Sequence, residues 1–452
     1  MTSIWWIRRD LRLTDNPALH SALGLGDVIP VFILDPAFAS QSPRRRSFLY
    51  EGLSSLNKKL QSRGSYLVIR AGKPVDVLCQ LIQETNSTTI FAEEDYTSYA
   101  RKRDALVASQ LPLQLIHGQT VHHPEFVKKV DGKPYTIYTP YSKVWKSLLQ
   151  DIKLIPAPKY LNTPAGIKSE SIPGFESNPL FPAGEAEALR RLTDFISERI
   201  FAYAETRNRT DLDGTSALSP YLRFGMLGLR QAVSAAKQAW TKSESAEERS
   251  GAEIWLNELI WREFYIQILH QFPQVRQNAF NPALSNIPWR NNESEFSAWK
   301  NGLTGMPIVD AAMRQLKETG WMHNRARMIV ASFLVKDLLI DWRWGEAWFM
   351  ENLLDGDIAA NNGGWQWTAG TGTDPAPYFR IFNPVLQSAK FDPNGDYIRK
   401  WVPELRGVNA KEIHAPWENK IKVTGYPDKP IVEHGIVKER TLKAYSISKE
   451  NK

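Results

Sequence analysis

Two apolar runs, Ser3-Ile-Trp-Trp-Ile7 and Ile29-Pro-Val-Phe-Ile-Leu34, decide the fold class of the first part of the chain. Short runs rich in β-branched and aromatic residues alternate with helical stretches up to about residue 120, which is the pattern of βαβ units around a parallel sheet. Helices normally cover both faces of such a sheet, so we predict a Rossmann-like domain. Its strands are predicted over 3–7, 29–34, 66–69, 88–91 and 113–116, and its helices over 44–63, 74–83 and 99–109.

The rest of the chain divides into a connector and a helical region. Residues 131–185 carry eight prolines and few periodic apolar positions, which is typical of a long connector over a surface. From about Glu185 helical periodicity dominates, and the polar end after Leu442 is expected to fray. The sequence therefore predicts an α/β domain over 1–130, a connector over 131–185 and an all-α domain over 186–452.

The composition indicates a folded protein with a modest basic excess. Of 452 residues, 42% are hydrophobic and 23% charged, and 56 basic against 49 acidic residues give a net charge of +7, which fits a polyanionic partner. The single cysteine, Cys79, excludes an internal disulfide and indicates a reducing compartment, so we expect a cytoplasmic protein. We also expect a monomer. Because no signal peptide and no run of eighteen apolar residues is present, no membrane contact is predicted.

Two stretches suggest a lined pocket. Residues 355–367 read Asp-Gly-Asp-Ile-Ala-Ala-Asn-Asn-Gly-Gly-Trp-Gln-Trp, which is too polar for a core helix and too aromatic for a solvent loop. Upstream, Trp255, Glu258, Trp261 and Arg262 recur at helical spacing and share one face. That face could be the surface of a half-buried helix with an ion pair. A carboxylate between two indoles, however, costs free energy in an apolar core unless it is hydrogen-bonded.

Three further features remain open to more than one interpretation. In Asp213-Gly-Thr-Ser-Ala-Leu-Ser-Pro220, Ser219 is predicted to cap a helix, and the preceding amides and hydroxyls could also cradle a pyrophosphate. Two acids at 355 and 357 could be caps or a metal pair, but no histidine cluster accompanies them, so no metal site is predicted. His323 is expected to be a hydrogen-bonded structural residue rather than a general base.

Together these motifs resemble the DNA photolyase and cryptochrome family, most closely the class I enzymes that act on cyclobutane pyrimidine dimers. The resemblance runs from Trp5-Trp-Ile-Arg-Arg-Asp-Leu-Arg12 to Val402-Pro-Glu-Leu-Arg406. It implies a helical FAD-binding domain and a light-driven lyase, in which reduced FAD passes an electron to a flipped-out dimer in ultraviolet-damaged DNA and restores the two pyrimidines.

The resemblance also implies roles for individual residues. The implied catalytic residues are Glu258, Asn361 and Met328. The implied FAD-binding residues are Tyr203, Thr215, Ser216, Ala217, Leu218, Ser219, Trp255, Arg327, Asp355, Gly356, Asp357 and Asn361, with Asp355 paired to Arg327. Electron transfer is implied for Trp289, Trp342 and Trp365. DNA contacts are implied for Glu258, Trp261, Arg262, Asn324, Arg325, Trp367 and Arg380.

Departures from the family pattern sharpen these expectations. Enzymes for the six-four photoproduct carry histidines where this chain has Asn324 and Met328, and plant cryptochromes place aspartate at Asn361, whose carboxamide can support a reduced anionic flavin. Ala217 stands where some relatives have a phosphate-binding arginine. Relatives with a folate antenna show Asn-Glu at Tyr99-Ala100, so a deazaflavin or flavin mononucleotide antenna is favoured over folate, and the absence of an antenna is equally allowed. A cryptochrome photoreceptor and a light-independent flavin electron carrier remain the alternatives.

Overall fold

The computed structural model describes residues 1–39 and 42–450, and the chain forms two compact units. The first unit contains Met1–Tyr135, Thr139–Ala202 and Ser216–Gln271, and the second contains Thr136–Tyr138, Tyr203–Thr215 and Phe272–Lys452. Helical residues 216–271 thus belong to the same compact unit as the sheet. The domain limits inferred from the sequence, 1–130, 131–185 and 186–452, remain a prediction.

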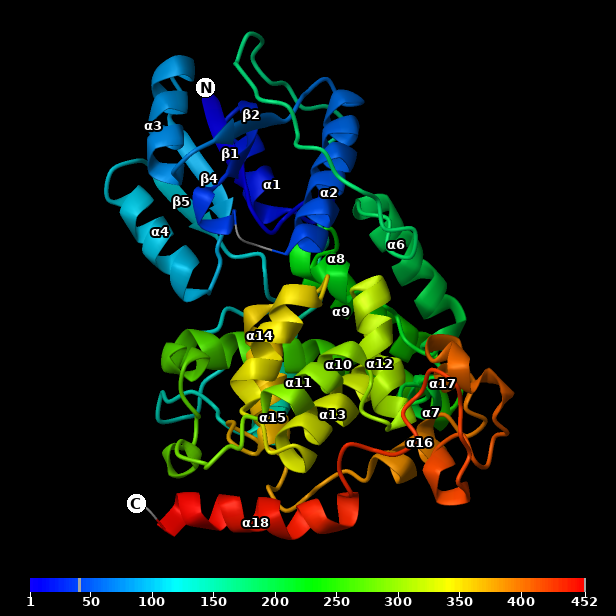
Figure 1. Ribbon diagram of the computed structural model, residues 1–452. Helices are drawn as coiled ribbons and strands as arrows, with labels where there is room; N and C mark the ends of the chain where they lie inside the picture. Colours follow the sequence, from blue (N-terminus) through cyan, green and yellow to red (C-terminus); the bar gives the residue numbers. More distant parts are fainter. Residues whose placement is uncertain (40–41, 451–452) are drawn as a thin grey trace. The chain divides into compact units, whose positions relative to one another are not determined.

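A five-stranded parallel sheet forms the centre of the first unit, with the strand order β3-β2-β1-β4-β5 (Figure 1). All five predicted strands are confirmed, and none of their ends moves by more than two residues. After β3 the chain returns to the other side of β1, so the strand order reverses between β1 and β4, where ligands of such sheets bind. The strands are β1 (Thr2–Ile7), β2 (Asp27–Leu34), β3 (Val68–Ala71), β4 (Thr89–Glu93) and β5 (Leu113–Ile116).

Helices lie on both sides of this sheet, as predicted. In Figure 1, α3 (Pro74–Thr85) and α4 (Ser98–Ala108) lie on one side, and α1 (Pro17–Leu23) and α2 (Pro43–Gln61) on the other. Ile4 and Trp6 of β1 share a buried cluster with Leu78 of α3 and Val107 of α4, because alternate side chains of a strand point to opposite faces. Helix α1 was not predicted, and the side chain of Asn16 caps its first turn.

The connector contains a helix that the sequence did not reveal. Helix α5 (Tyr138–Ser147) buries Tyr141 and Trp145, which lie one helical turn apart, but flanking prolines and lysines hide this short pattern. Further along, the Ser169 hydroxyl and the Glu170 carboxylate accept hydrogen bonds from the amides of Ile69 and Ala71 at 2.9 and 2.8 Å. These contacts cover β3, an edge strand whose amides would otherwise be unpaired.

Six further helical elements complete the first unit. Helix α9 packs along α10, and α10 is the longest helix and carries the face from Trp255 to Arg262. The elements are η1 (Pro36–Phe38), α6 (Glu185–Asp194), η2 (Phe195–Arg199), α8 (Ser219–Phe224), α9 (Leu229–Lys242) and α10 (Ala246–Gln271).

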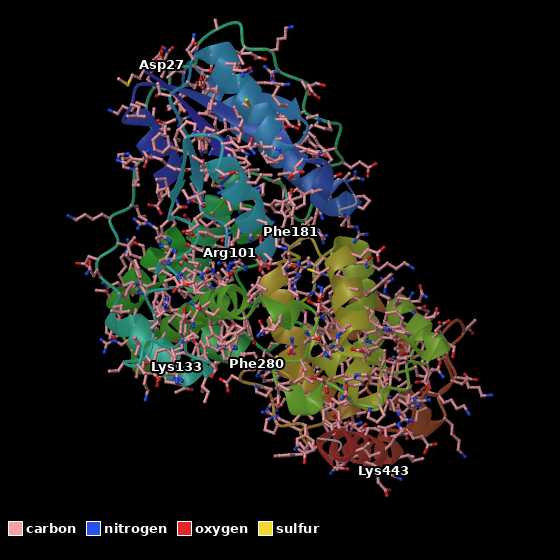
Figure 2. The ribbon with its side chains drawn as sticks, turned by 90° about the vertical axis from the view of Figure 1, so that its left-hand side faces the viewer. Asp27, Arg101, Lys133, Phe181, Phe280 and Lys443 are labelled. Atoms are coloured by element: carbon pink, nitrogen blue, oxygen red, sulfur yellow. The ribbon has the colours of Figure 1, made fainter. Side chains whose placement is uncertain are left out.

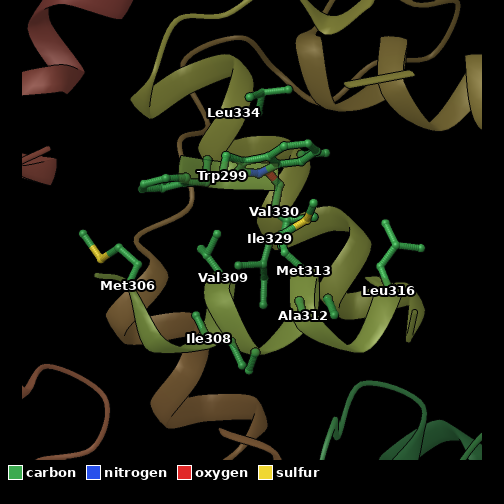
Figure 3. Packing of buried hydrophobic residues seen from close by; sticks show 14 of the residues in the cluster. Trp299, Met306, Ile308, Val309, Ala312, Met313, Leu316, Ile329, Val330 and Leu334 are labelled. Carbon is green, nitrogen blue, oxygen red and sulfur yellow. The ribbon is translucent and has the colours of Figure 1, made fainter. Parts of the chain in front are cut away.

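The second unit is helical throughout its described part, as predicted. Its core contains Trp299 of α11, Met313 of α12, Val330 of α13 and Leu334 of η5 (Figure 3). Its principal α-helices are α11 (Glu293–Asn301), α12 (Pro307–Thr319), α13 (Asn324–Ser332), α14 (Trp342–Asn352), α15 (Ile358–Ala369), α16 (Pro384–Phe391), α17 (Asp396–Trp401) and α18 (His434–Glu450). Shorter elements are α7 (Tyr203–Thr206), η3 (Pro273–Arg276), η4 (Pro282–Leu284), η5 (Phe333–Asp337), η6 (Pro403–Gly407) and η7 (Pro416–Asn419).

The expectation that the chain frays after Leu442 is wrong. Residues 442–450 continue α18, in which Lys443 is exposed (Figure 2) and Tyr445 is fully buried. One buried phenol and its hydrogen bonds hold this polar segment, and such a contact leaves no periodic signal in the sequence. Among the described residues, no helix is both long enough and apolar enough to cross a membrane.

Gly225 provides a test of local packing in the first unit. It ends α8 in the left-handed region with φ +65°, and a Cβ there would lie 1.7 Å from the carbonyl oxygen of Arg9. We predict that Gly225→Ala lowers the free energy of unfolding by about 3 kcal/mol, because the backbone of Arg9 must move. Gly435→Ala is the control, since no atom lies within 4 Å of its Cβ position. Equal urea midpoints for the two variants would contradict this account.

Candidate functional site

A buried ion pair in the second unit joins two of the predicted site residues. Arg327 of α13 donates from Nη2 to Asp355 Oδ2 at 2.8 Å, and its Nε donates to the Met322 carbonyl at 2.9 Å. The Leu354 amide donates to the Gly320 carbonyl at 2.7 Å, which ties the loop carrying Asp355 and Gly356 to the start of α13. The second oxygen of Asp355, Oδ1, is buried and has no hydrogen-bond partner among the described residues.

Asp357 and Asn361 are fixed at the start of α15. The Asp357 carboxylate accepts from the amides of Ala359 and Ala360 at 3.0 and 3.3 Å, so it is the N-cap of this helix. The Asn361 side chain donates from Nδ2 to the Glu346 carbonyl at 3.0 Å. That bond orients the amide and leaves Oδ1 as the atom that can accept a hydrogen bond from a ligand.

Glu346 is a residue that the sequence interpretation missed. Its carbonyl holds Asn361, and its carboxylate accepts from Asn362 Nδ2 at 3.1 Å. Burial raises the pKa of the Glu346 carboxyl to about 7. The sequence did contain a sign of this residue. In the run Trp342-Arg-Trp-Gly-Glu-Ala-Trp348 an acid lies among three indoles, much as Glu258 lies between two.

The three predicted electron-transfer tryptophans all lie in the second unit but share no ring contact among the described residues. Trp365 contacts Trp299 and Phe349, at centroid distances of 6.2 and 5.0 Å. Its indole packs on Gly345, where a Cβ would lie 2.1 Å from the ring. The guanidinium of Arg343 lies over Trp342 at 4.7 Å, and Trp289 contacts Tyr445 at 6.1 Å.

The start of α13 presents three predicted substrate residues. Asn324 is exposed, whereas Arg325 and Met328 are half-buried. Arg325 donates from Nη2 to Asn208 Oδ1 at 2.7 Å, and its guanidinium lies 4.4 Å from the centre of the Phe391 ring. His323 is the N-cap of α13 and accepts a hydrogen bond from the Arg325 amide, as expected, and burial lowers its pKa to about 4.

The other predicted site residues of this unit differ in how exposed their side chains are. Arg380 is exposed beside the Phe382 ring, at 5.5 Å, and Trp367 is half-buried on α15. Near Trp367 on that helix, Gly364 is exposed, with no atom within 4 Å of its Cβ position. Tyr203 is buried at the start of α7, under the guanidinium of Arg207 at 5.7 Å.

The first unit holds the remaining predicted residues on α10 and, except for Thr215, those just before α8. Trp255 is buried against Phe195 at 5.0 Å, whereas Glu258, Trp261 and Arg262 are half-buried. The Trp261 ring contacts two neighbouring aromatic rings of α10, those of Phe264 and Tyr265, each at 5.5 Å. The residues from 255 to 262 therefore form one helical face with a buried and an accessible end.

The segment from Thr215 to Ser219 departs from the predicted cap. Helix α8 begins at Ser219, so Leu218 is the N-cap and the assignment of Ser219 as the cap is wrong by one residue. Ala217 has φ +48°, an uncommon conformation for a residue with a side chain. Leu218 follows it with φ −88° and ψ −5°. Because a left-handed residue beside a right-handed one turns successive backbone amides toward the same side, this turn has the arrangement that binds anions.

The comparisons with known proteins agree with this arrangement. Residues 3–159 match the family model described as DNA photolyase, and residues 255–447 match the FAD binding domain of DNA photolyase. The deoxyribodipyrimidine photo-lyase of Synechococcus sp. is 41% identical, over 98% of this chain and 95% of that protein. The chain therefore belongs to the DNA photolyase family.

Solved structures of the family share the fold over the whole chain. A bacterial class III photolyase from Agrobacterium tumefaciens has a TM-score of 0.93 and 37% identity, covering 99% of this chain and 98% of that chain. An archaeal photolyase from Sulfolobus tokodaii, whose structure holds two FAD molecules, has a TM-score of 0.85 and 33% identity, covering 99% of this chain and 100% of that chain.

Glu346 should make stability depend on pH. The folded protein keeps the proton of this carboxyl up to about pH 7, whereas the unfolded chain loses it near its ordinary pKa of 4.5. The associated stability is present below pH 4.5 and is lost as the pH rises through 7. We predict that the melting temperature of Glu346→Gln, relative to wild type, is higher at pH 8 than at pH 5. Glu351→Gln, at an exposed position of α14, should show no such change.

Proposed function

We propose that this protein is a light-dependent DNA lyase that splits cyclobutane pyrimidine dimers. The observation that carries the proposal is the relation to a deoxyribodipyrimidine photo-lyase, at 41% identity over 98% of the chain. Asn324 and Met328 at the start of α13 favour this substrate over the six-four photoproduct, for which relatives use histidines. When bound, reduced FAD supplies the electron that starts the reaction.

The residues present fit a flavin dinucleotide. Buried polar atoms are almost always paired, so the unpartnered Oδ1 of Asp355 indicates a donor supplied by a bound group. Arg327 orients this carboxylate through the 2.8 Å bond. In the first unit, the left-handed turn at Ala217 supports an anion cradle formed by Ser216 to Ser219, to which we assign the pyrophosphate, and Trp255 is assigned to the nucleotide. In the second unit, Thr215 and Tyr203 are assigned to FAD as well.

Substrate recognition is assigned to both units separately. On α10, Trp261 offers an accessible indole on which an extruded base can stack, and Glu258 offers a carboxylate that can accept from its edge. Arg262 lies next to them on the same helix. On α13, exposed Asn324 can donate and accept at once, and Met328 supplies a polarizable apolar contact.

Contacts to the DNA backbone are assigned to arginines. Arg325 is held by Asn208 and by the Phe391 ring, so its guanidinium is preorganised for a phosphate. Arg380 is exposed, and Trp367 offers a further ring for stacking. Because phosphate contacts release counterions, binding should weaken steeply with salt.

The tryptophan route to the flavin remains a proposal. Trp365, on the same helix as Asn361, is its first member, and Trp342 and Trp289 follow. Trp299 contacts Trp365, so it extends the aromatic network around the first step. Trp342 and Trp365 are both buried, so oxidation of their indoles would require little reorganisation of water, which supports the assignment.

An antenna chromophore fits the point where the strand order reverses. There the guanidiniums of Arg8 and Arg103 lie over the Trp6 ring at 4.8 and 4.7 Å, and Arg8 Nε is buried without a hydrogen-bond acceptor among the described residues. Tyr99 donates to Asp35 at 2.5 Å, and buried Ala100 offers no carboxylate for a pterin. A deazaflavin or flavin mononucleotide is therefore favoured over folate.

The alternatives to this function are a cryptochrome photoreceptor and a light-independent flavin electron carrier. Asn361, rather than aspartate, weighs against a cryptochrome photoreceptor, and Glu258 with Trp261 and Asn324 would lack a role in a light-independent electron carrier. The monomeric state and the cytoplasmic location rest on the sequence alone. No membrane partner is assigned.

Repair under light tests the proposal directly. We predict that the purified protein with reduced FAD removes dimers from an oligonucleotide under blue light and not in the dark. Glu258→Ala should lower the repair yield per absorbed photon without lowering FAD content, because the carboxylate that stabilises charge on the dimer is lost. Glu253→Ala on the exposed side of α10 is the matched control. Equal binding of damaged and undamaged DNA, with no light-dependent repair, would favour the two alternatives.

Asn361→Asp tests how the cofactor is tuned. The substitution replaces the donor to the Glu346 carbonyl with a charged acceptor, which should lower the free energy of unfolding by roughly 2 kcal/mol. The added negative charge should also make the bound flavin harder to reduce. Reductive titration measures this potential, and thermal unfolding measures the stability. An unchanged potential would remove Asn361 from the residues that tune FAD.

A further inference from the structure

A buried carboxylate lies on α10 directly behind the tryptophan assigned to the substrate. Glu263 is 2% exposed and follows Trp261 by two residues. Residues two apart on a helix do not face each other, so Glu263 points into the first unit while the Trp261 indole remains half-buried. Burial raises the pKa of the Glu263 carboxyl to about 7, although three hydrogen bonds to this group act in the opposite direction.

All three donors to this carboxylate come from a segment 118 to 142 positions earlier in the chain. Oε1 of Glu263 accepts from the Val121 amide, and Oε2 accepts from the His122 amide at 3.5 Å and from Trp145 Nε1 at 2.5 Å. A second contact joins the same two parts, because His122 Nε2 lies 3.1 Å from the Trp145 carbonyl oxygen. Both oxygens of an ionised carboxylate are acceptors, so one side chain fixes the loop at 121–122 and helix α5 to α10.

Aromatic contacts connect the position of α5 with the Trp261 ring. Tyr141 and Trp145 lie one turn apart on α5 and share the face that packs against α10. The Tyr141 ring packs on the Phe264 ring at 5.1 Å, and the Phe264 ring lies edge-on to the Trp261 indole at 5.5 Å. Tyr141 and Phe264 are 2% and 0% exposed. Because buried rings are close-packed, a shift of α5 moves Phe264 and changes the support of Trp261.

We propose that Glu263 is a positioning residue for the substrate: by fixing α5 against α10, it holds the Trp261 indole in the orientation that stacks on an extruded pyrimidine. This inference rests on the proposed function, which assigns the stacking to Trp261. Glu263 acts through Trp145 and the rings of Tyr141 and Phe264. A ring that is already fixed binds a base more tightly, because less side-chain freedom is lost on binding.

A second buried carboxylate of the first unit provides a comparison with a purely structural role. Glu185 is 3% exposed and accepts from the Leu13 and Thr14 amides at 3.1 and 2.9 Å and from Lys59 Nζ at 3.1 Å. These donors lie on the segment between β1 and α1 and on α2. Loss of the carboxylate at either site leaves buried donors without an acceptor and lowers the free energy of unfolding. Only the site on α10 should also change the binding of substrate.

Binding of an oligonucleotide with one pyrimidine dimer to the FAD-loaded protein in the dark tests the inference. Glu263→Gln should raise the Kd for the damaged strand about tenfold and leave the Kd for the undamaged strand unchanged, because undamaged DNA is held by phosphate contacts. Trp145→Phe removes one donor but keeps a ring, and it should act in the same direction. Glu185→Gln is the matched control and should keep both wild-type constants. Loss of folded protein lowers the number of binding sites rather than their affinity, so the titration separates positioning from destabilisation.

A double-mutant cycle tests whether the effect passes through the indole. Trp261→Ala alone should weaken binding of the damaged strand, and the addition of Glu263→Gln should weaken it no further, because no ring remains to be oriented. Additive effects would overturn the inference, since Glu263 would then act by another route. Wild-type affinity in Trp261→Ala together with weakened binding in Glu263→Gln would overturn it as well.

Fluorine NMR of the protein labelled with 5-fluorotryptophan reports on the Trp261 ring without DNA, and Trp261→Phe identifies its resonance. Glu263→Gln should shift and broaden this resonance, whereas Glu185→Gln should leave it unchanged. If the resonance responds in this way but the wild type binds damaged and undamaged strands equally, Glu263 positions Trp261 and the proposed function fails. If the wild type prefers the damaged strand and both Glu263→Gln and Trp145→Phe keep its affinity, or if the resonance is the same in Glu263→Gln and wild type, the inference is overturned.

Discussion

The packing of the helices in the second unit depends on the pairing of their buried polar groups. Asp355 lies under the surface with one oxygen held by Arg327 and the other unpaired among the described residues. Losing the arginine would leave an uncompensated buried charge, so the α13 start and the loop before α15 cannot separate at low cost. Asp357 then caps α15, and the Asn361 amide crosses to the α14 backbone. These hydrogen bonds fix α13, α14 and α15 to one another near their ends. Asp355 Oδ1 remains as a hydrogen-bond acceptor without a partner among the described residues.

In the first unit, the order of the strands brings buried polar groups together. The reversal of strand order between β1 and β4 gathers Arg8 and Asp104 at the carboxyl ends of the strands, in a bidentate pair at 2.6 Å. Nearby, the buried Arg12–Glu93 ion pair joins the segment after β1 to the end of β4 at 2.5 Å. Burial raises the pKa of Glu93 to about 7, but the pair keeps both charges compensated.

Two buried polar clusters of the helical unit meet the cost of burial in different ways. The Asp355 carboxylate is paired with the Arg327 guanidinium. At Lys336, desolvation lowers the pKa of the amine, whose Nζ donates to the Ala369 carbonyl and to the Tyr445 phenol. The phenol of Tyr445 connects the second to the indole of Trp289.

The sequence by itself determined the fold class, the five strands and the motifs around Glu258, Asp355 and Asn361, because these depend on local periodicity and on residue types in short runs. It did not show α5, the C-terminal half of α18, or the roles of Glu346 and Lys336. The two roles depend on contacts between different helices: Lys336 meets Tyr445 109 positions later, and the Glu346 carbonyl on α14 meets the Asn361 amide on α15. Only tertiary packing decides which buried polar groups face one another, because desolvation and pairing are properties of the assembled core rather than of a segment.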